Sequence, residues 1–126
     1  MDNRPQEHNV LSLAYLGDSV FEVFVREYLI ISNKTKPNLL HKEAIKIVNA
    51  KTQARIYASI INDLTEEEQS IANRAKNSKI HRAISMNLAD YKLATAFEAV
   101  LGYLYIQGKQ DRIDTICKKA LGIINL

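Results

Sequence analysis

The stretch from Val10 to Ile31 repeats apolar residues at the spacing of an α-helix. These residues fill more than half of the helix circumference, which is wider than the single apolar stripe of a surface helix. The positions are Leu13, Leu16, Val20, Phe21, Phe24, Val25, Tyr28 and Leu29. A helix of this kind belongs at the centre of a fold, and we expect the other elements to pack around it.

The rest of the chain carries helical patterns with little punctuation. It has four glycines and two prolines, and no five-residue stretch alternates as a half-buried strand does. The clearest helix start is Thr65, because Glu68 three residues later completes a capping box. We therefore expect an all-α fold of six helices. The first three are predicted at Val10 to Ile31, Asn38 to Ala50 and Thr52 to Ile61. The fourth begins at Thr65, and the basic stretch forms its end and the loop after it. The last two are predicted from Asn87 or Asp90 to before Gly108, and from Gln110 to Leu121 with a stop at Gly122.

Composition narrows the class of protein. With 126 residues, of which 47% are hydrophobic and 25% charged, the chain suits one folded domain, which we expect to span residues 1–126. Cys117 is the single cysteine and is expected in the core, a pattern that fits a reducing compartment. Glu22, Arg26 and Glu27 interrupt the longest apolar stretch, Val20 to Ile31, and the start lacks the apolar segment of a signal peptide. These features predict a cytoplasmic protein without a membrane partner.

Positive charge is concentrated rather than spread. The net charge is +3 and the sequence pI is about 9.0. Residues 73–87 contain no carboxylate, although they include Arg74, Lys76, Lys79, His81 and Arg82. An acidic block at residues 63–68 precedes them. The pattern fits a nucleic-acid contact, and it equally fits a solvated helix whose end charges suit the helix dipole.

Two carboxylates lie inside the most apolar helical stretches. Asp18 follows Gly17, and Glu98 precedes Gly102 by four residues. Glycine and a buried carboxylate each destabilise an apolar helix, so their pairing suggests a site. If the two helices pack together, the acids can share one Mg²⁺. The alternative is that each carboxylate faces solvent or pairs with a lysine.

Other chemistries find little support. The three histidines are far apart in the sequence, and no histidine or cysteine pair has zinc spacing. A glycine-rich phosphate loop is also missing, so no nucleotide cofactor is expected.

Several segments resemble ribonuclease III. Residues 13–23, LAYLGDSVFEV, are similar to the signature helix of that family, and residues 94–105, ATAFEAVLGYLY, are similar to its second catalytic helix. Residues 35–42, TKPNLLHK, and 49–54, NAKTQA, resemble the mini-ribonuclease III branch. Residues 74–79, RAKNSK, are similar to the basic RNA-contacting stretch of that branch.

The resemblance implies a homodimeric endonuclease for double-stranded RNA, without the separate RNA-binding domain of the full-length enzymes. Asp18 and Glu98 match the essential carboxylates and would hold Mg²⁺, giving 5′-phosphate and 3′-hydroxyl ends. The branch also implies maturation of precursor ribosomal RNA of the 23S type in a bacterial cytoplasm. The expected RNA-binding residues are Arg74, Lys76, Asn77, Lys79 and Arg82, with His41, Lys42 and Lys51 as weaker candidates.

The match has departures that affect metal binding. The full-length enzymes have acids where this chain has Ala14 and Thr95. Their acid-glycine-acid segment falls on residues 37–39, which carry no carboxylate here. The mini branch shares the alanine and the threonine. Fewer ligands should leave more water on the metal and weaken its retention.

Two further readings of the chain stay open. A non-catalytic helical RNA-binding or ribosome-associated module would use the basic stretch and keep the acids as structural groups. A helical dimerisation domain would bind no RNA.

The first helix carries more large apolar side chains than one small domain can cover. Those that compete for burial are Phe21, Phe24, Val25 and Tyr28, so part of that helix is expected to face a second subunit.

Overall fold

The computed structural model describes residues 9–32, 36–78 and 87–123. Within these ranges it contains six α-helices and no strand, as expected. The helices are α1 (Val10–Ser32), α2 (Leu40–Val48), α3 (Ala50–Ile60), α4 (Glu66–Lys76), α5 (Leu88–Ile106) and α6 (Gln110–Ile123). Two short 3₁₀ turns, η2 (Pro37–Leu39) and η3 (Ile61–Asp63), precede α2 and follow α3.

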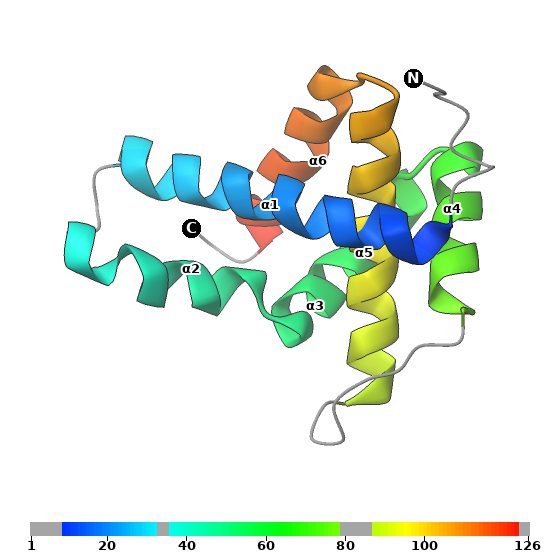
Figure 1. Cartoon of the computed structure of the whole chain (residues 1–126), viewed down its shortest axis with the longest axis horizontal. Helices are drawn as coiled ribbons and strands as arrows, with labels where there is room; N and C mark the ends of the chain where they lie inside the picture. The colour runs from blue at the N-terminus through cyan, green and yellow to red at the C-terminus, as the bar shows by residue number, and fades with distance from the viewer. Residues whose placement is uncertain (1–8, 33–35, 79–86, 124–126) are drawn as a thin grey trace.

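Helix α5 is the centre of the fold. Helices α1, α3 and α4 pack around it, and the N-terminal half of α1 crosses α5 near the middle of α5 (Figure 1). Ten of the 19 residues of α5 are buried, compared with seven of the 23 residues of α1. The expectation that the first helix is the central one was therefore wrong. One face of α1 packs on α5, while Leu16, Val20, Phe24 and Tyr28 stay only partly buried.

An aromatic pair stabilises the crossing of α1 and α5. The rings of Phe21 and Phe97 meet edge to face, with centroids 5.1 Å apart and planes at 88°. Both side chains are buried. Such a contact adds about 0.5–1.5 kcal/mol to the apolar burial of the two rings. The pair fixes the relative position of the helices that carry Asp18 and Glu98.

Most helix boundaries agree with the local signals. Helix α5 begins after Asn87, whose side chain accepts a hydrogen bond from the backbone N–H of Asp90 at 3.1 Å. It ends before Gly108, which has a φ of +72° that favours glycine. Helix α6 does not stop at Gly122 as predicted but continues to Ile123. Glycine in a helix costs only about 1 kcal/mol, which the packing of the preceding turn can offset.

The connection between α2 and α3 differs from the prediction. Helix α2 begins at Leu40, after the η2 turn, and ends at Val48, so it is shorter than expected at both ends. Helix α3 begins at Ala50 because Asn49 caps it. The Asn49 side chain accepts a hydrogen bond from the backbone N–H of Thr52 at 2.9 Å. The sharp turn at Asn49 sets the direction in which α3 approaches α5.

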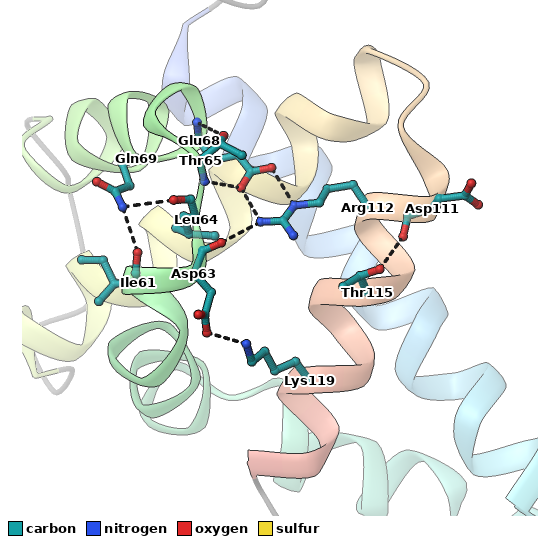
Figure 2. A network of polar contacts seen from close by, with 10 residues as sticks. All are labelled: Ile61, Asp63, Leu64, Thr65, Glu68, Gln69, Asp111, Arg112, Thr115 and Lys119. Atoms are coloured by element: carbon teal, nitrogen blue, oxygen red, sulfur yellow. Dashed lines mark hydrogen bonds and ion pairs between the residues drawn. The ribbon is translucent and has the colours of Figure 1, made fainter.

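The predicted capping box is present at the start of α4. The backbone N–H of Thr65 donates to the Glu68 carboxylate at 3.0 Å, and the Glu68 N–H donates to the Thr65 hydroxyl at 3.1 Å. The same carboxylate accepts two hydrogen bonds from Arg112 of α6, at 2.8 and 2.9 Å (Figure 2). Arg112 also donates to the carbonyl of Asp63, whose carboxylate pairs with Lys119. The acidic block thus ties α6 to the start of α4 in addition to suiting the helix dipole.

Cys117 lies in the core, as expected. Its side chain is buried in α6, and burial, with a smaller effect of Asp114, raises the pKa of the thiol to about 12. None of the helices in the described ranges is long and apolar enough to cross a membrane.

Candidate functional site

The site is built on direct backbone contact between α1 and α5. A Cβ atom placed on Gly17 would lie 1.7 Å from the carbonyl oxygen of Glu98. One placed on Gly102 would lie 1.9 Å from the carbonyl oxygen of Leu13. Any side chain at either position would force the helices apart, so both glycines are needed for this close approach. The unfavourable glycines noted in the sequence have this structural reason.

The crossing brings Asp18 and Glu98 together. Asp18 follows Gly17 directly, and Glu98 is the residue whose carbonyl faces Gly17. Asp18 is exposed and Glu98 is half-buried. Burial, followed by the hydrogen-bonding contact and charge of Asp18, raises the pKa of Glu98 to about 8. The two carboxylates therefore repel one another in the ionised state, and Glu98 holds a proton near neutral pH.

This donor set fits a hard divalent cation. Two adjacent carboxylates with access to solvent provide oxygen ligands and leave room for water, which is the arrangement that Mg²⁺ prefers. A cation would also replace the proton and remove the repulsion between the acids. The described ranges contain no group of three or more acidic, histidine or cysteine side chains suited to a metal. Asp18 and Glu98 would thus be the carboxylate ligands, and water would complete the coordination.

The positions that are acidic in full-length ribonuclease III are occupied differently. Ala14 and Thr95 are both buried, at 6% exposure. The Thr95 hydroxyl donates to the carbonyl of Tyr91 at 2.8 Å, so it serves its own helix. Residues 37–39 form the exposed η2 turn. None of these positions adds a carboxylate to the pair.

Gln53 also belongs to the site, and no chemical argument from the sequence singled it out. It lies in the first turns of α3, is 2% exposed, and interacts with the carboxylate of Glu98. This interaction lowers the pKa of Glu98, in opposition to the larger effects of burial and of Asp18. The one indication of Gln53 in the sequence was that it lies in the segment 49–54, which resembles the mini-ribonuclease III branch.

The basic residues at the end of α4 lie beside the start of α1. Arg74 and Asn77 are exposed, and together with Ser78 and residues 9–11 they line an open hollow. Lys76 is half-buried in the last turn of α4. The expected Lys79 and Arg82 lie outside the described residues. This end of α4 therefore presents positive charge next to the N-terminus of a long helix, which also attracts anions.

The weaker RNA-binding candidates lie elsewhere. His41 and Lys42 are exposed in the first turn of α2, and His41 lines a hollow with Arg26 and Ile30 near the end of α1. Lys51 is exposed in the first turn of α3. The Arg74 hollow adjoins the start of α1, and the His41 hollow adjoins its last turns. At 1.5 Å per residue, these two parts of α1 lie about 27 Å apart. They do not form one patch, and Asp18 lies between them along the helix.

Comparisons with known proteins agree with this architecture. The sequence profile of the Ribonuclease III domain matches residues 11–109. The chain is 42% identical to a Mini-ribonuclease 3 from Brevibacillus brevis, covering 95% of this chain and 90% of that protein. It is 36% identical to a Mini-ribonuclease 3 from Staphylococcus aureus, covering 99% and 98%. A crystal structure of a protein from Fusobacterium nucleatum superimposes with a TM-score of 0.82 at 38% identity, covering 93% of this chain and 94% of that one.

Proposed function

The chain belongs to the ribonuclease III family, in its mini-ribonuclease III branch, and from that premise we propose that it is a Mg²⁺-dependent endoribonuclease acting on double-stranded RNA. The observation that carries the proposal is the pairing of Asp18 and Glu98 at the crossing of α1 and α5. Among the residues that the structure describes, no ion pair with a basic side chain involves either carboxylate. Its geometry suits a cation.

The chain's own residues have defined tasks in such a reaction. Mg²⁺ held by Asp18 and Glu98 would supply an activated water and would stabilise charge on the phosphate. Asp18, which is exposed, faces the side from which a phosphodiester can approach. Glu98 must release its proton to act as a ligand, and its partial burial then strengthens its attraction to the cation. In-line attack of a water oxygen on phosphorus would break the P–O3′ bond, so that the phosphate stays on the 5′ end and the departing 3′ oxygen takes up a proton to become a hydroxyl.

Double-stranded RNA would be held by charge and shape. A-form RNA presents phosphates and 2′-hydroxyls across a shallow minor groove, so few base contacts are needed. Two groups of polar side chains lie towards opposite ends of α1. One is Arg74 with Asn77, and the other is His41 with Lys42. Asp18 lies between the two groups along the helix. We assign phosphate or sugar contacts to both groups. Lys76, Lys79, Arg82 and Lys51 complete the proposed contact set.

We also propose that two copies of the chain form a homodimer. A hollow beside α1 is lined mainly by apolar side chains. They are Leu16, Val20, Val23 and Phe24 of α1, together with Tyr105 and Ile113. Val23 is 64% exposed and Tyr105 is 53% exposed. This apolar face is the part of α1 that α5 leaves uncovered, and burial against a second copy would remove it from water. Two copies would also present two carboxylate pairs to one duplex.

The proposed natural substrate is precursor ribosomal RNA of the 23S type in a bacterial cytoplasm. The support for this is the resemblance of residues 35–42 and 49–54 to the mini branch, together with the similarity to relatives named Mini-ribonuclease 3. Mapping the ends of ribosomal RNA after depletion of the protein tests this assignment.

One experiment separates this function from that of a non-catalytic RNA-binding module. A labelled RNA duplex is incubated with the protein and Mg²⁺ in one reaction, and with the protein, Mg²⁺ and a chelator in a second reaction. The proposal expects cleavage that the chelator abolishes while RNA remains bound. Duplex binding without cleavage at any Mg²⁺ concentration would instead support the non-catalytic module.

A further inference from the structure

The side chain of Gln53 links three helices at the carboxylate site. It belongs to α3 and is 2% exposed. Its Nε2 donates a hydrogen bond of 2.7 Å to the carbonyl of Val48, the last residue of α2. The same side chain interacts with the Glu98 carboxylate of α5 and favours its ionised form. The other buried polar side chains in the described ranges are Glu68 and Thr95, and their hydrogen bonds go elsewhere. Glu68 accepts from Arg112, and the Thr95 hydroxyl donates to the carbonyl of Tyr91.

The Val48 carbonyl determines which way the Gln53 amide points. A carbonyl only accepts hydrogen bonds, so the NH₂ group of the amide must face it. The other N–H of that group is then free to donate to the Glu98 carboxylate. Because Val48 lies at the end of α2 and just before the Asn49 cap, the amide is anchored on backbone rather than on a mobile side chain.

The remaining polar atom of the amide has no partner. Gln53 Oε1 is buried without a hydrogen-bond donor from the described residues. A buried acceptor that lacks a donor is unfavourable for folding. An apolar side chain of similar size would avoid this cost and still fill the core. The presence of glutamine therefore indicates that the amide serves the site it faces.

We propose that Gln53 is a positioning residue of the cation site: its amide N–H holds the Glu98 carboxylate in the orientation that receives a divalent cation. The unpartnered Oε1 is then available to accept a hydrogen bond from water at the site. This inference rests on the proposed function, because it assumes that Asp18 and Glu98 are the ligands. It assigns to the chain a residue that compensates in part for the missing acids.

The test compares Gln53→Met with a matched control, Gln69→Met. Gln69 is also a partly buried glutamine whose Nε2 donates to backbone carbonyls, those of Ile61 and Leu64, at 3.1 and 3.2 Å (Figure 2). Binding of Mn²⁺ to the RNA-free protein is measured by calorimetry. Loss of a residue that orients a metal ligand typically weakens affinity by about 10–100-fold. We expect such a loss for Gln53→Met and none for Gln69→Met.

A second measurement uses the wild-type chain, so it does not depend on the folding of the variant. The side-chain amide signals of Gln53 and Gln69 are followed by nuclear magnetic resonance as Mg²⁺ is added. The Gln53 signals should shift along the binding curve, while those of Gln69 stay in place. Gln53 signals that do not move at saturating Mg²⁺ would overturn the proposal, as would Mn²⁺ affinity in Gln53→Met equal to that of the wild type.

The Asp18→Asn variant separates this inference from the proposed function. If the wild type binds Mn²⁺ no better than Asp18→Asn does, the assignment of the cation site fails and the role of Gln53 fails with it. If the wild type binds through Asp18 but Gln53→Met binds equally well, only the positioning role of Gln53 is overturned.

Discussion

The carbonyl oxygen of Glu98 occupies the space that a side chain at Gly17 would need. The contact is with backbone and cannot be relieved by a change of rotamer. We expect Gly17→Ala to destabilise the fold by about 1–3 kcal/mol, as overpacking of a core does, and to separate Asp18 from Glu98. Urea unfolding measures the loss. The control is Gly122→Ala, where a Cβ meets nothing within 4 Å and a gain of about 0.5–1 kcal/mol is expected. Equal effects at both glycines would contradict the account of the crossing.

Removing either carboxylate should abolish cleavage. Asp18→Asn and Glu98→Gln keep the side-chain volume but remove the charge that attracts the cation. We expect cleavage of a duplex to fall to background while RNA binding and the melting temperature change little. Glu22→Gln, one turn along α1 from Asp18, serves as the control because Glu22 pairs with Arg26. Full activity in either acid variant would refute the assignment.

The basic end of α4 should contribute to the salt dependence of RNA binding. Each cation that neutralises a phosphate adds slightly less than one unit to the slope of log affinity against log salt concentration. The triple change of Arg74, Lys76 and Lys79 to Ala should flatten that slope by about two to three units per protomer. Fluorescence anisotropy with labelled duplex measures it. Lys118→Ala on α6 should leave the slope as it is, and an unchanged slope in the triple variant would place the RNA-binding surface elsewhere.

The ion pair between Glu68 and Arg112 should make stability depend on pH. Burial raises the pKa of Glu68, but the hydrogen bonds from Arg112 and from the Thr65 N–H outweigh it, so the pKa lies below its ordinary value of 4.5. The folded state thus gains stability above pH 4.5 that is lost as pH falls through the lowered pKa. Glu68→Gln should lose about 2 kcal/mol at pH 7 and differ less from the wild type in acid. Unfolding in urea across pH checks this.

A control for that prediction lies in the same network. Asp63 and Lys119 form a pair whose side chains are 52% and 49% exposed. Exposed ion pairs contribute little, so Asp63→Asn should change stability by about 0.5 kcal/mol or less at any pH. A pH-independent effect of Glu68→Gln would show that the carboxylate contributes through packing alone.

The apolar face of α1 should hold the dimer together. Val23→Glu places a charge on the hollow shared with Phe24 and Tyr105, so it should convert dimers to monomers at micromolar concentration. Sedimentation velocity distinguishes the two states. Ile45→Glu on α2, another exposed apolar position, should leave the dimer intact. A wild-type chain that sediments only as a monomer would contradict the proposed assembly.

Local sequence signals were sufficient for the number of helices and for several of their ends. The Thr65 capping box and the stop before Gly108 depend on hydrogen bonds and backbone angles within a few residues, so they can be read from the chain directly. The prediction failed at Gly122, where helix propensity is weak and packing decides the end. The two carboxylates were singled out as a candidate site because glycine and an acid are costly in an apolar helix.

The tertiary structure decided what those residues meet. Periodicity shows that a helix has an apolar face but does not show which helix covers it, so α5 rather than α1 proved central. The partners of Glu98 and Glu68 are Gln53 and Arg112, each more than 40 residues away along the chain. Nothing in the local sequence encodes such pairs. They form because close packing at Gly17 and Gly102 fixes the helices, and only fixed helices can bring distant polar groups within hydrogen-bonding distance.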